Sequence, residues 1–187
     1  LHNQNRQQSR VRLFETGRRF IGSVEALDEL DQQLQISGLI AGSRHPEAWY
    51  HKSEKVDFYD LKAHVEAMFA LNNGGKPSYE PSRCGYLHPG RSADIFIDGE
   101  FVGVMGELHP QLSKELGANQ TLYVFDIALS AVLGATLPEY KAVSKFPEVR
   151  RDLALLVDRS VPVSALEKVI SENAGEAFKE VLVFDVY

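Results

Sequence analysis

The segment 92–108, SADIFIDGEFVGVMGEL, restricts the possible folds more than any other part of the chain. Apolar and polar residues alternate on both sides of the dipeptide Asp98-Gly99. Alternation with a period of two is typical of strands, and Asp-Gly is a preferred pair for a two-residue type I′ turn, because both positions need a positive φ. The segment therefore predicts a β-hairpin and, with it, an antiparallel sheet.

The clearest helical pattern lies upstream, at 56–72. Its apolar residues Leu61, Val65, Met68 and Phe69 recur at helical spacing, and Asp57 can cap the first turn. Other patterns predict strands at 11–17, 34–42 and 121–129, a hairpin partner at 18–22, a loop or weak helical turn at 26–34, and a short helix at 110–117. Together they predict an α+β fold with an antiparallel sheet.

Pro138 and the polar residues after it mark a predicted boundary between two domains, 1–137 and 138–187. The second domain is predicted to be a β-α-β unit, with strands at 152–158 and 180–187 and a helix at 163–174. On the first strand, alternation sends Leu153, Leu155 and Val157 to one face.

Composition limits the function more than the fold. The 187 residues are 44% hydrophobic and 25% charged, as in ordinary globular proteins, and the net charge of −6 excludes an overall basic field. Contact with nucleic acid must then come from a local patch. One cysteine, no signal peptide and no apolar run of about 20 residues predict a cytoplasmic chain without a membrane partner. The missing initial Met and the apolar final segment predict a piece of a longer protein.

Two segments carry candidate functional residues. In LHPGRSAD, at 87–94, His88 can act as an acid or base, Arg91 can bind an anion, and Asp94 can be a partner; alternatively, this is a turn in which Arg91 pairs with a neighbouring carboxylate. Six histidines invite a metal site, but their spacing does not match a dedicated one, so no metal is predicted.

The second segment, at 144–163, places two adjacent arginines before an apolar run. Arg150 and Arg151 are either solvated charges at a strand end or ligands for phosphates, because the guanidinium binds phosphate oxygens in a bidentate manner. Lys141, Lys145 and Phe146 lie close by in the sequence, and an aromatic ring can stack on an unpaired RNA base.

Four segments in the same order resemble the β subunit of bacterial phenylalanyl-tRNA synthetases: NRQQSRVRLFETGRRF, VDFYDLKAHVEAMF, LHPGRSADIFIDGEFVGVMGELHP and FPEVRRDLALLVD with FDVY. The resemblance covers essentially the whole chain. It implies that 1–137 is the later part of a non-catalytic domain with the class II synthetase fold. It also implies that 138–187 is the first half of a ferredoxin-fold anticodon-binding domain, a truncated β-α-β unit.

The resemblance further implies partners and chemistry. The α subunit would bind phenylalanine and ATP with magnesium, while the β subunit supports an α2β2 assembly and binds phenylalanine tRNA. No cofactor is then expected in this chain. Lys141, Lys145, Phe146, Arg150 and Arg151 become candidates for a surface that faces tRNA or orients the domain, and either arginine can instead form a buried ion pair.

A working class II site needs an arginine and a glutamate on one face of a strand, and a second arginine after a later strand. Here Arg12 and Glu15 are three residues apart, which predicts opposite faces, and no arginine follows the strand at 121–129. Arg12, Glu15, His88 and Arg91 are therefore predicted to form a vestigial cleft without aminoacylation activity. The alternatives are a paralogue that binds an amino acid or adenylate around His88 and Arg91, and a regulatory module that binds amino acids.

A ferredoxin-like domain has the order β-α-β-β-α-β, and in the usual strand order its first two strands are not neighbours. The second domain is therefore predicted to expose unpaired strand edges and an apolar face. That combination predicts either a mobile region or one that completes its sheet with another copy of the chain, by swapping or edge pairing. The face would consist of Leu153, Leu155, Val157, Leu182 and Phe184.

Overall fold

The computed structural model describes residues 8–21, 31–71, 75–133, 140 and 145–186. It divides into two compact units, the first ending at Tyr140 and the second beginning at Lys141. In the described residues, no helix is both long and apolar enough to cross a membrane.

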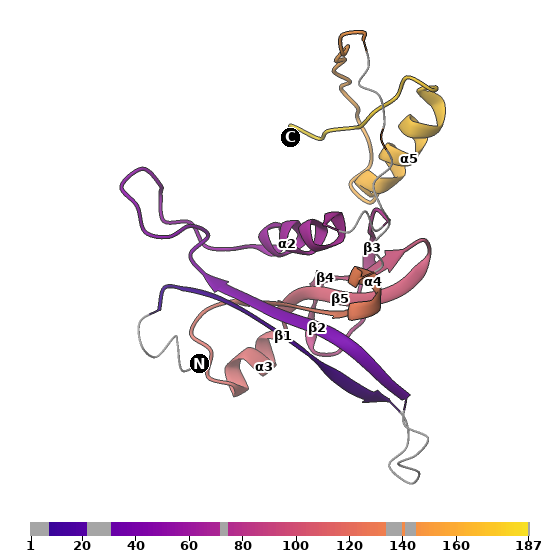
Figure 1. The fold of residues 1–187 in the computed structure, drawn as a ribbon. Coiled ribbons are helices and arrows are strands. Elements are labelled where there is room, and N and C mark those ends of the chain that lie inside the picture. The colour runs from indigo at the N-terminus through magenta and orange to yellow at the C-terminus, as the bar shows by residue number, and fades with distance from the viewer. Residues whose placement is uncertain (1–7, 22–30, 72–74, 134–139, 141–144, 187) are drawn as a thin grey trace. The chain divides into compact units, whose positions relative to one another are not determined.

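The first unit is a six-stranded sheet in the order β1-β2-β6-β5-β4-β3, with every neighbouring pair antiparallel (Figure 1). The predicted α+β fold with an antiparallel sheet is therefore confirmed. The strands are β1 (Arg10–Ile21), β2 (Asp31–Gly42), β3 (Ser78–Pro81), β4 (Leu87–Ile97), β5 (Glu100–Leu108) and β6 (Leu122–Ala128), and the helices of this unit are α2 (Phe58–Ala70), α3 (Pro110–Glu115) and α4 (Leu129–Leu133).

The hairpin predicted around Asp98-Gly99 is formed by β4 and β5. Asp98 has a φ of 51° and Gly99 a φ of 85°, as a type I′ turn requires. Among the described residues with side chains, Asp98 is the one with a positive φ. The turn is therefore fixed by local residue chemistry.

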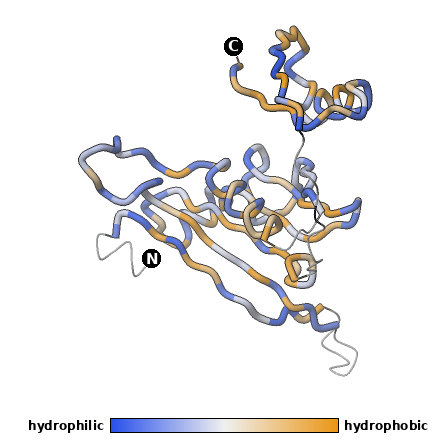
Figure 2. The backbone as a smooth tube through the Cα atoms, turned by 45° about the horizontal axis from the view of Figure 1, so that its top comes forward, coloured by the Kyte–Doolittle hydropathy of each residue, from blue (hydrophilic) through white to orange (hydrophobic). Residues whose placement is uncertain are grey.

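Helix α2 covers one face of this sheet (Figure 1). It begins where predicted, because the Asp57 carboxylate accepts hydrogen bonds from the backbone N–H groups of Tyr59 and Asp60, at 2.8 and 3.0 Å. Its apolar side packs on the alternating apolar residues of the central strands, and the hydrophobic stretches of those strands are visible in Figure 2. This core includes Leu61, Val65 and Phe69 from the helix and Ile95, Met105, Phe125 and Ile127 from the sheet.

Two predictions about the first sheet were wrong. Residues 18–21 are not a hairpin partner of 11–17, because β1 runs through Gly17 and pairs with β2 from Arg10 to Ile21; residue 22 lies outside the described residues. Of the segment 26–34, expected in a loop or weak helical turn, residues 31–34 belong to β2, and 26–30 lie outside the described residues. A period-two pattern does not distinguish one long strand from two short ones, and the long pairing satisfies more backbone hydrogen bonds.

The second unit departs further from its prediction. Its helix, α5 (Val163–Asn173), forms as expected, but no strand forms at 152–158 or among the described residues of 180–187. Alternating apolar residues become a strand only when another strand completes the ladder, and neither segment has such a partner within the described residues. Their apolar side chains remain largely exposed, at 65% for Leu153 and 64% for Phe184.

Candidate functional site

The four residues predicted to form one cleft lie on two faces of the sheet. In the strand register Arg12 is opposite Ile40, a residue of the core under α2. Glu15 is opposite Ser37, and both line a groove on the other face. Arg12 and Glu15 therefore cannot act on the same ligand from one side of the sheet.

Arg12 is used to join the ends of two strands. Its guanidinium donates hydrogen bonds to the carbonyl oxygens of Val11, Ala41 and Ser43, at 2.8, 3.1 and 3.2 Å. Burial, followed by the nearby charge of Arg10, lowers the pKa of Arg12. This arrangement fixes β1 against the end of β2.

Arg91 forms an ion pair with Glu107 across β4 and β5, with 2.8 Å between Nη1 and Oε2. Glu107 is only 9% exposed, so this pair satisfies a buried carboxylate. The hydrogen bond from Arg91 to Glu107 raises the pKa of Arg91. The geometry matches the alternative in which Arg91 pairs with a neighbouring carboxylate.

His88 and Asp94 do not join that pair. The Nδ1 atom of His88 accepts a hydrogen bond from the backbone N–H of Gly90 at 3.0 Å, which closes a local turn. Asp94 is opposite Val104 in the register, and Val104 lines the groove on the face away from α2. The segment 87–94 is thus a turn that leads into a strand, and its polar residues point to different places.

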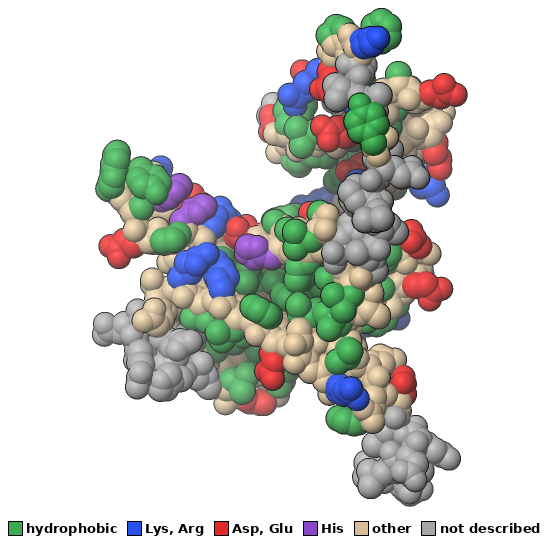
Figure 3. Space-filling model, viewed as in Figure 1, with side chains coloured by type: hydrophobic (Ala, Val, Ile, Leu, Met, Phe, Trp, Pro, Cys, Tyr) green, Lys and Arg blue, Asp and Glu red, His purple; other side chains and the backbone are tan. Residues whose placement is uncertain are grey.

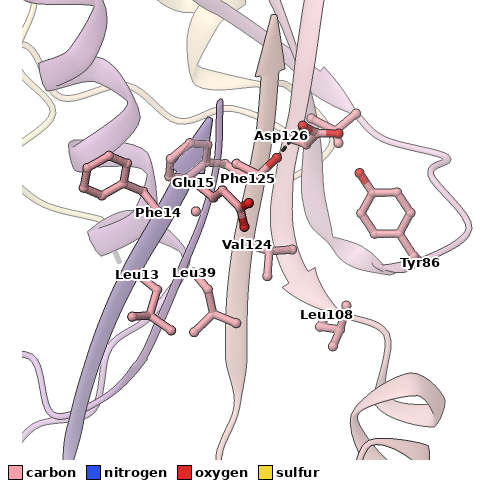
Figure 4. A pocket seen from close by; sticks show the side chains of 12 residues that line it. Leu13, Phe14, Glu15, Leu39, Tyr86, Leu108, Val124, Phe125 and Asp126 are labelled. Atoms are coloured by element: carbon pink, nitrogen blue, oxygen red, sulfur yellow. Dashed lines mark hydrogen bonds between the residues drawn. The ribbon is translucent and has the colours of Figure 1, made fainter. Parts of the chain in front are cut away.

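The groove on the face away from α2 has a volume of about 620 Å³ (Figure 4). Leu13, Leu39, Val124 and Leu108 form its apolar part, while Glu15 and Asp126 lie at one end. The hydroxyl of Ser37 donates to Asp126 at 2.7 Å, and burial raises the pKa of Tyr86 beside them. The described residues that line this groove include no lysine or arginine.

Sequence reasoning did not find this groove. Its lining comes from β1 and β2 and from β5 and β6, two pairs of strands that are far apart in the sequence, and from Tyr86. The residue two positions before Glu15, on the same face, is Leu13. The groove therefore pairs Glu15 with an aliphatic side chain on this strand and not with an arginine.

A second, smaller hollow of about 350 Å³ shares Glu15, Ser37 and Asp126 with the groove and adds Arg18 and Arg19. Arg18 donates to the Oε1 atom of Gln32 at 2.8 Å. Within the described ranges, no group of three or more His, Cys, Asp and Glu side chains is placed to hold a metal ion.

The candidate residues for RNA binding lie in the second unit, where Lys145, Phe146, Arg150 and Arg151 are exposed. Lys141 lies outside the described residues. Neither arginine forms an ion pair with another described residue. Glu148, two residues before Arg150, pairs with Lys179. The hydrogen bond from Lys179, followed by the charge of Lys179, lowers the pKa of Glu148.

Two family models match this chain. Residues 1–129 match the phenylalanyl tRNA synthetase beta chain CLM domain, and residues 144–187 match the ferredoxin-fold anticodon binding domain. The two matches fall on the first and second unit respectively.

Similar curated proteins are named phenylalanine–tRNA ligase beta subunit. The chain is 48% identical to the one from Pseudomonas syringae pv. tomato over 187 residues, 43% identical to the one from Haemophilus influenzae over 188, and 40% identical to the one from Hahella chejuensis over 187. Each alignment covers 100% of this chain but only 23–24% of the relative, so the chain spans about a quarter of their length. The chain therefore belongs to the family of phenylalanyl-tRNA synthetase β chains.

Proposed function

We propose that this chain serves a phenylalanine–tRNA ligase as a supporting and tRNA-binding part of the β subunit, while the α subunit carries the aminoacylation chemistry. The first unit is a class II synthetase-like domain that has lost its catalytic site and helps to hold the α and β subunits together. The second unit contributes to binding the anticodon region of phenylalanine tRNA. The relatives share the name of a ligase subunit, and this name supports the proposal.

The lining of the groove supports the absence of aminoacylation in the first unit. ATP carries several negative charges, and its site needs cations that stabilise the charge that moves in the reaction. The groove instead presents Leu13 in its apolar part and the carboxylates Glu15 and Asp126 at one end. None of the described residues that line the groove is a lysine or an arginine, so the groove does not fit a triphosphate.

The observation that carries the tRNA-binding part is the exposed pair Arg150 and Arg151, at the start of a segment that matches an anticodon-binding domain. Two adjacent guanidinium groups that pair with no described carboxylate remain available for phosphate oxygens. Lys145 adds a third positive charge in the same segment. The chain has a net charge of −6, so attraction of RNA phosphates requires a local cluster such as this one.

The salt dependence of tRNA binding tests this role. In the full-length ligase, the double variant Arg150→Ala/Arg151→Ala should bind phenylalanine tRNA more weakly. The slope of log K against log salt concentration should become shallower by roughly 0.7–0.9 for each phosphate that the variant no longer binds, or about 1–2 in total. Titration of labelled tRNA at several salt concentrations measures both quantities.

The matched control is Lys76→Ala/Arg83→Ala, which removes the same charge from exposed positions of the first unit. It should leave the slope unchanged. If the Arg150/Arg151 variant kept the wild-type slope while remaining folded, these arginines would not be phosphate ligands, and the proposed tRNA surface would have to lie elsewhere.

A further inference from the structure

The loop between β2 and α2, residues 45–53, presents aromatic rings to solvent. We call it the aromatic loop. Trp49, the one tryptophan of the chain, is 96% exposed, and the adjacent Tyr50 is 66% exposed. In Figure 3, hydrophobic and histidine side chains gather over this projecting loop. Scattered apolar side chains are ordinary on a surface, but here two large exposed rings are adjacent in one loop.

Four rings of the aromatic loop form a continuous series of contacts. The rings of His45 and His51 stack with centroids 4.4 Å apart and planes 11° apart. Tyr50 lies against His51 at 4.5 Å, and Trp49 meets the edge of Tyr50 at 5.6 Å. These contacts link the four rings while Trp49 stays exposed.

The base of the aromatic loop is closed by the backbone and by ion pairs. The N–H of Val56 donates to the carbonyl of Gly42 at 2.9 Å, and the N–H of Arg44 donates to the carbonyl of Glu54 at 2.8 Å. The Arg44 guanidinium also pairs with Glu54 and Asp57, at 2.7 and 3.0 Å. A loop that is already ordered loses little entropy when it binds, so the tip is prepared for a partner.

The charge of the aromatic loop distinguishes between two classes of partner. From 45 to 53 the chain carries one cation, Lys52, and one anion, Glu47, which gives no net charge when the histidines are neutral. RNA affinity depends on an excess of Lys and Arg around the contact. Protein interfaces instead concentrate Trp and Tyr at a desolvated centre that is surrounded by polar residues. The composition of the loop matches the second description.

We infer that the aromatic loop anchors the partner subunit of the ligase by inserting Trp49 into an apolar pocket of that subunit. This inference rests on the proposed function, in which a β subunit assembles with an α subunit. The pocket should have an acceptor at its mouth for the indole N–H and a carboxylate near it for Lys52. Tyr50, His45 and His51 would pack at the rim and exclude water.

Subunit assembly of the full-length proteins tests this inference. Trp49→Ala in the full-length β chain should raise the Kd for the α subunit about 30-fold or more, because a tryptophan at the centre of an interface is a typical hot spot. Trp49→Phe keeps a ring and should lose less. The control Tyr140→Ala removes an aromatic that is 90% exposed outside the loop, and should leave the Kd unchanged. Mass photometry at nanomolar concentrations measures the assembly.

A second measurement places the contact. In a β chain labelled with 5-fluorotryptophan, Trp49→Phe identifies the ¹⁹F resonance of Trp49. This resonance should be solvent-exposed in the isolated β chain and become shielded when the α subunit is added. Shielding already present in the isolated chain would overturn the inference, because another part of the same polypeptide would then cover the loop.

The remaining outcomes separate the inference from the proposed function. An unchanged Kd for Trp49→Ala with normal wild-type assembly overturns the inference alone. A loss of tRNA affinity without a change in assembly also overturns it, in favour of an RNA-binding loop. If the wild-type subunits did not associate at all, the scaffolding role and the inference would both be wrong.

Discussion

Asp60 shows how one side chain links a helix start to the loop before it. Its carboxylate accepts a hydrogen bond from the backbone N–H of Asp57 at 2.8 Å and pairs with the Nε atom of Arg44 at 2.9 Å. Burial by itself raises the pKa of Asp60, but the hydrogen bond from Asp57 and the charge of Arg44 outweigh it, and the pKa lies below its usual value. Asp60 is therefore more stable as a carboxylate in the folded chain than in the unfolded one.

Replacing Asp60 by Asn should destabilise the chain in a pH-dependent way. Because the folded-state pKa is below the unfolded value of about 3.9, the charged group stabilises the fold above about pH 4 and loses this effect as the pH falls through its folded pKa. The variant should lower the free energy of unfolding by on the order of 1 kcal/mol at pH 7, and the deficit should shrink toward pH 3. Urea denaturation at several pH values measures it.

The control is Glu47→Gln, a carboxylate of the aromatic loop with no ion pair among the described residues. Its stability should follow that of the wild type across the same pH range. A deficit for Asp60→Asn that stays constant from pH 7 to pH 3 would show that shape, and not charge, accounts for the effect.

At the scale of elements, β5 and β6 approach each other closely at Gly103. A Cβ atom added there would clash with the carbonyl oxygen of Asp126 and lie 2.7 Å from the Cα of Ile127. Both atoms belong to the backbone of β6, which cannot rotate away. Gly103→Ala should therefore lower the free energy of unfolding by roughly 1–3 kcal/mol.

The contrasting variant is Gly17→Ala in β1, where an added Cβ would meet nothing within 4 Å. Since alanine reduces the entropy of the unfolded chain, this change should be neutral or stabilising by about 0.4–1 kcal/mol. Thermal unfolding of the two variants side by side gives the comparison. Equal stability of both would mean that β5 can shift away from β6 at little cost.

Local chemistry predicted some elements of this chain and could not predict others. The turn at Asp98-Gly99 and the start of α2 at Asp57 depend on neighbours in the sequence, and both form as expected. The groove depends on which residues of four strands lie opposite one another, for example Leu39 opposite Val124, and this register is not visible in any one segment. Sequence alternation correctly placed Arg12 and Glu15 on opposite faces but could not identify the groove that Glu15 joins.

At the scale of the whole molecule, the two units differ in how much apolar surface they bury. The first unit encloses a continuous core between α2 and the sheet. In the second unit α5 buries no residue, and the extended segments on either side of it leave Leu155 55% and Leu182 62% exposed. Figure 2 shows these hydrophobic stretches in the second unit. The second unit therefore lacks a closed core among its described residues, and its stability depends on further contacts.

We expect the 187-residue chain to associate with itself through these extended segments. Segments that combine unpaired backbone groups with exposed apolar side chains can complete a ladder by pairing with a second copy. The apparent mass in sedimentation equilibrium should then rise with protein concentration.

Leu155→Lys/Phe184→Lys should shift the chain toward the monomer, because charges on such segments oppose pairing. The control Leu71→Lys changes a leucine of the first unit that is 82% exposed, and should leave the association unaltered. A chain that stayed monomeric at every concentration would contradict the prediction, since exposed apolar side chains and unpaired backbone would then not suffice for pairing. Association that persisted in Leu155→Lys/Phe184→Lys but was lost in Leu71→Lys would place the contact in the first unit.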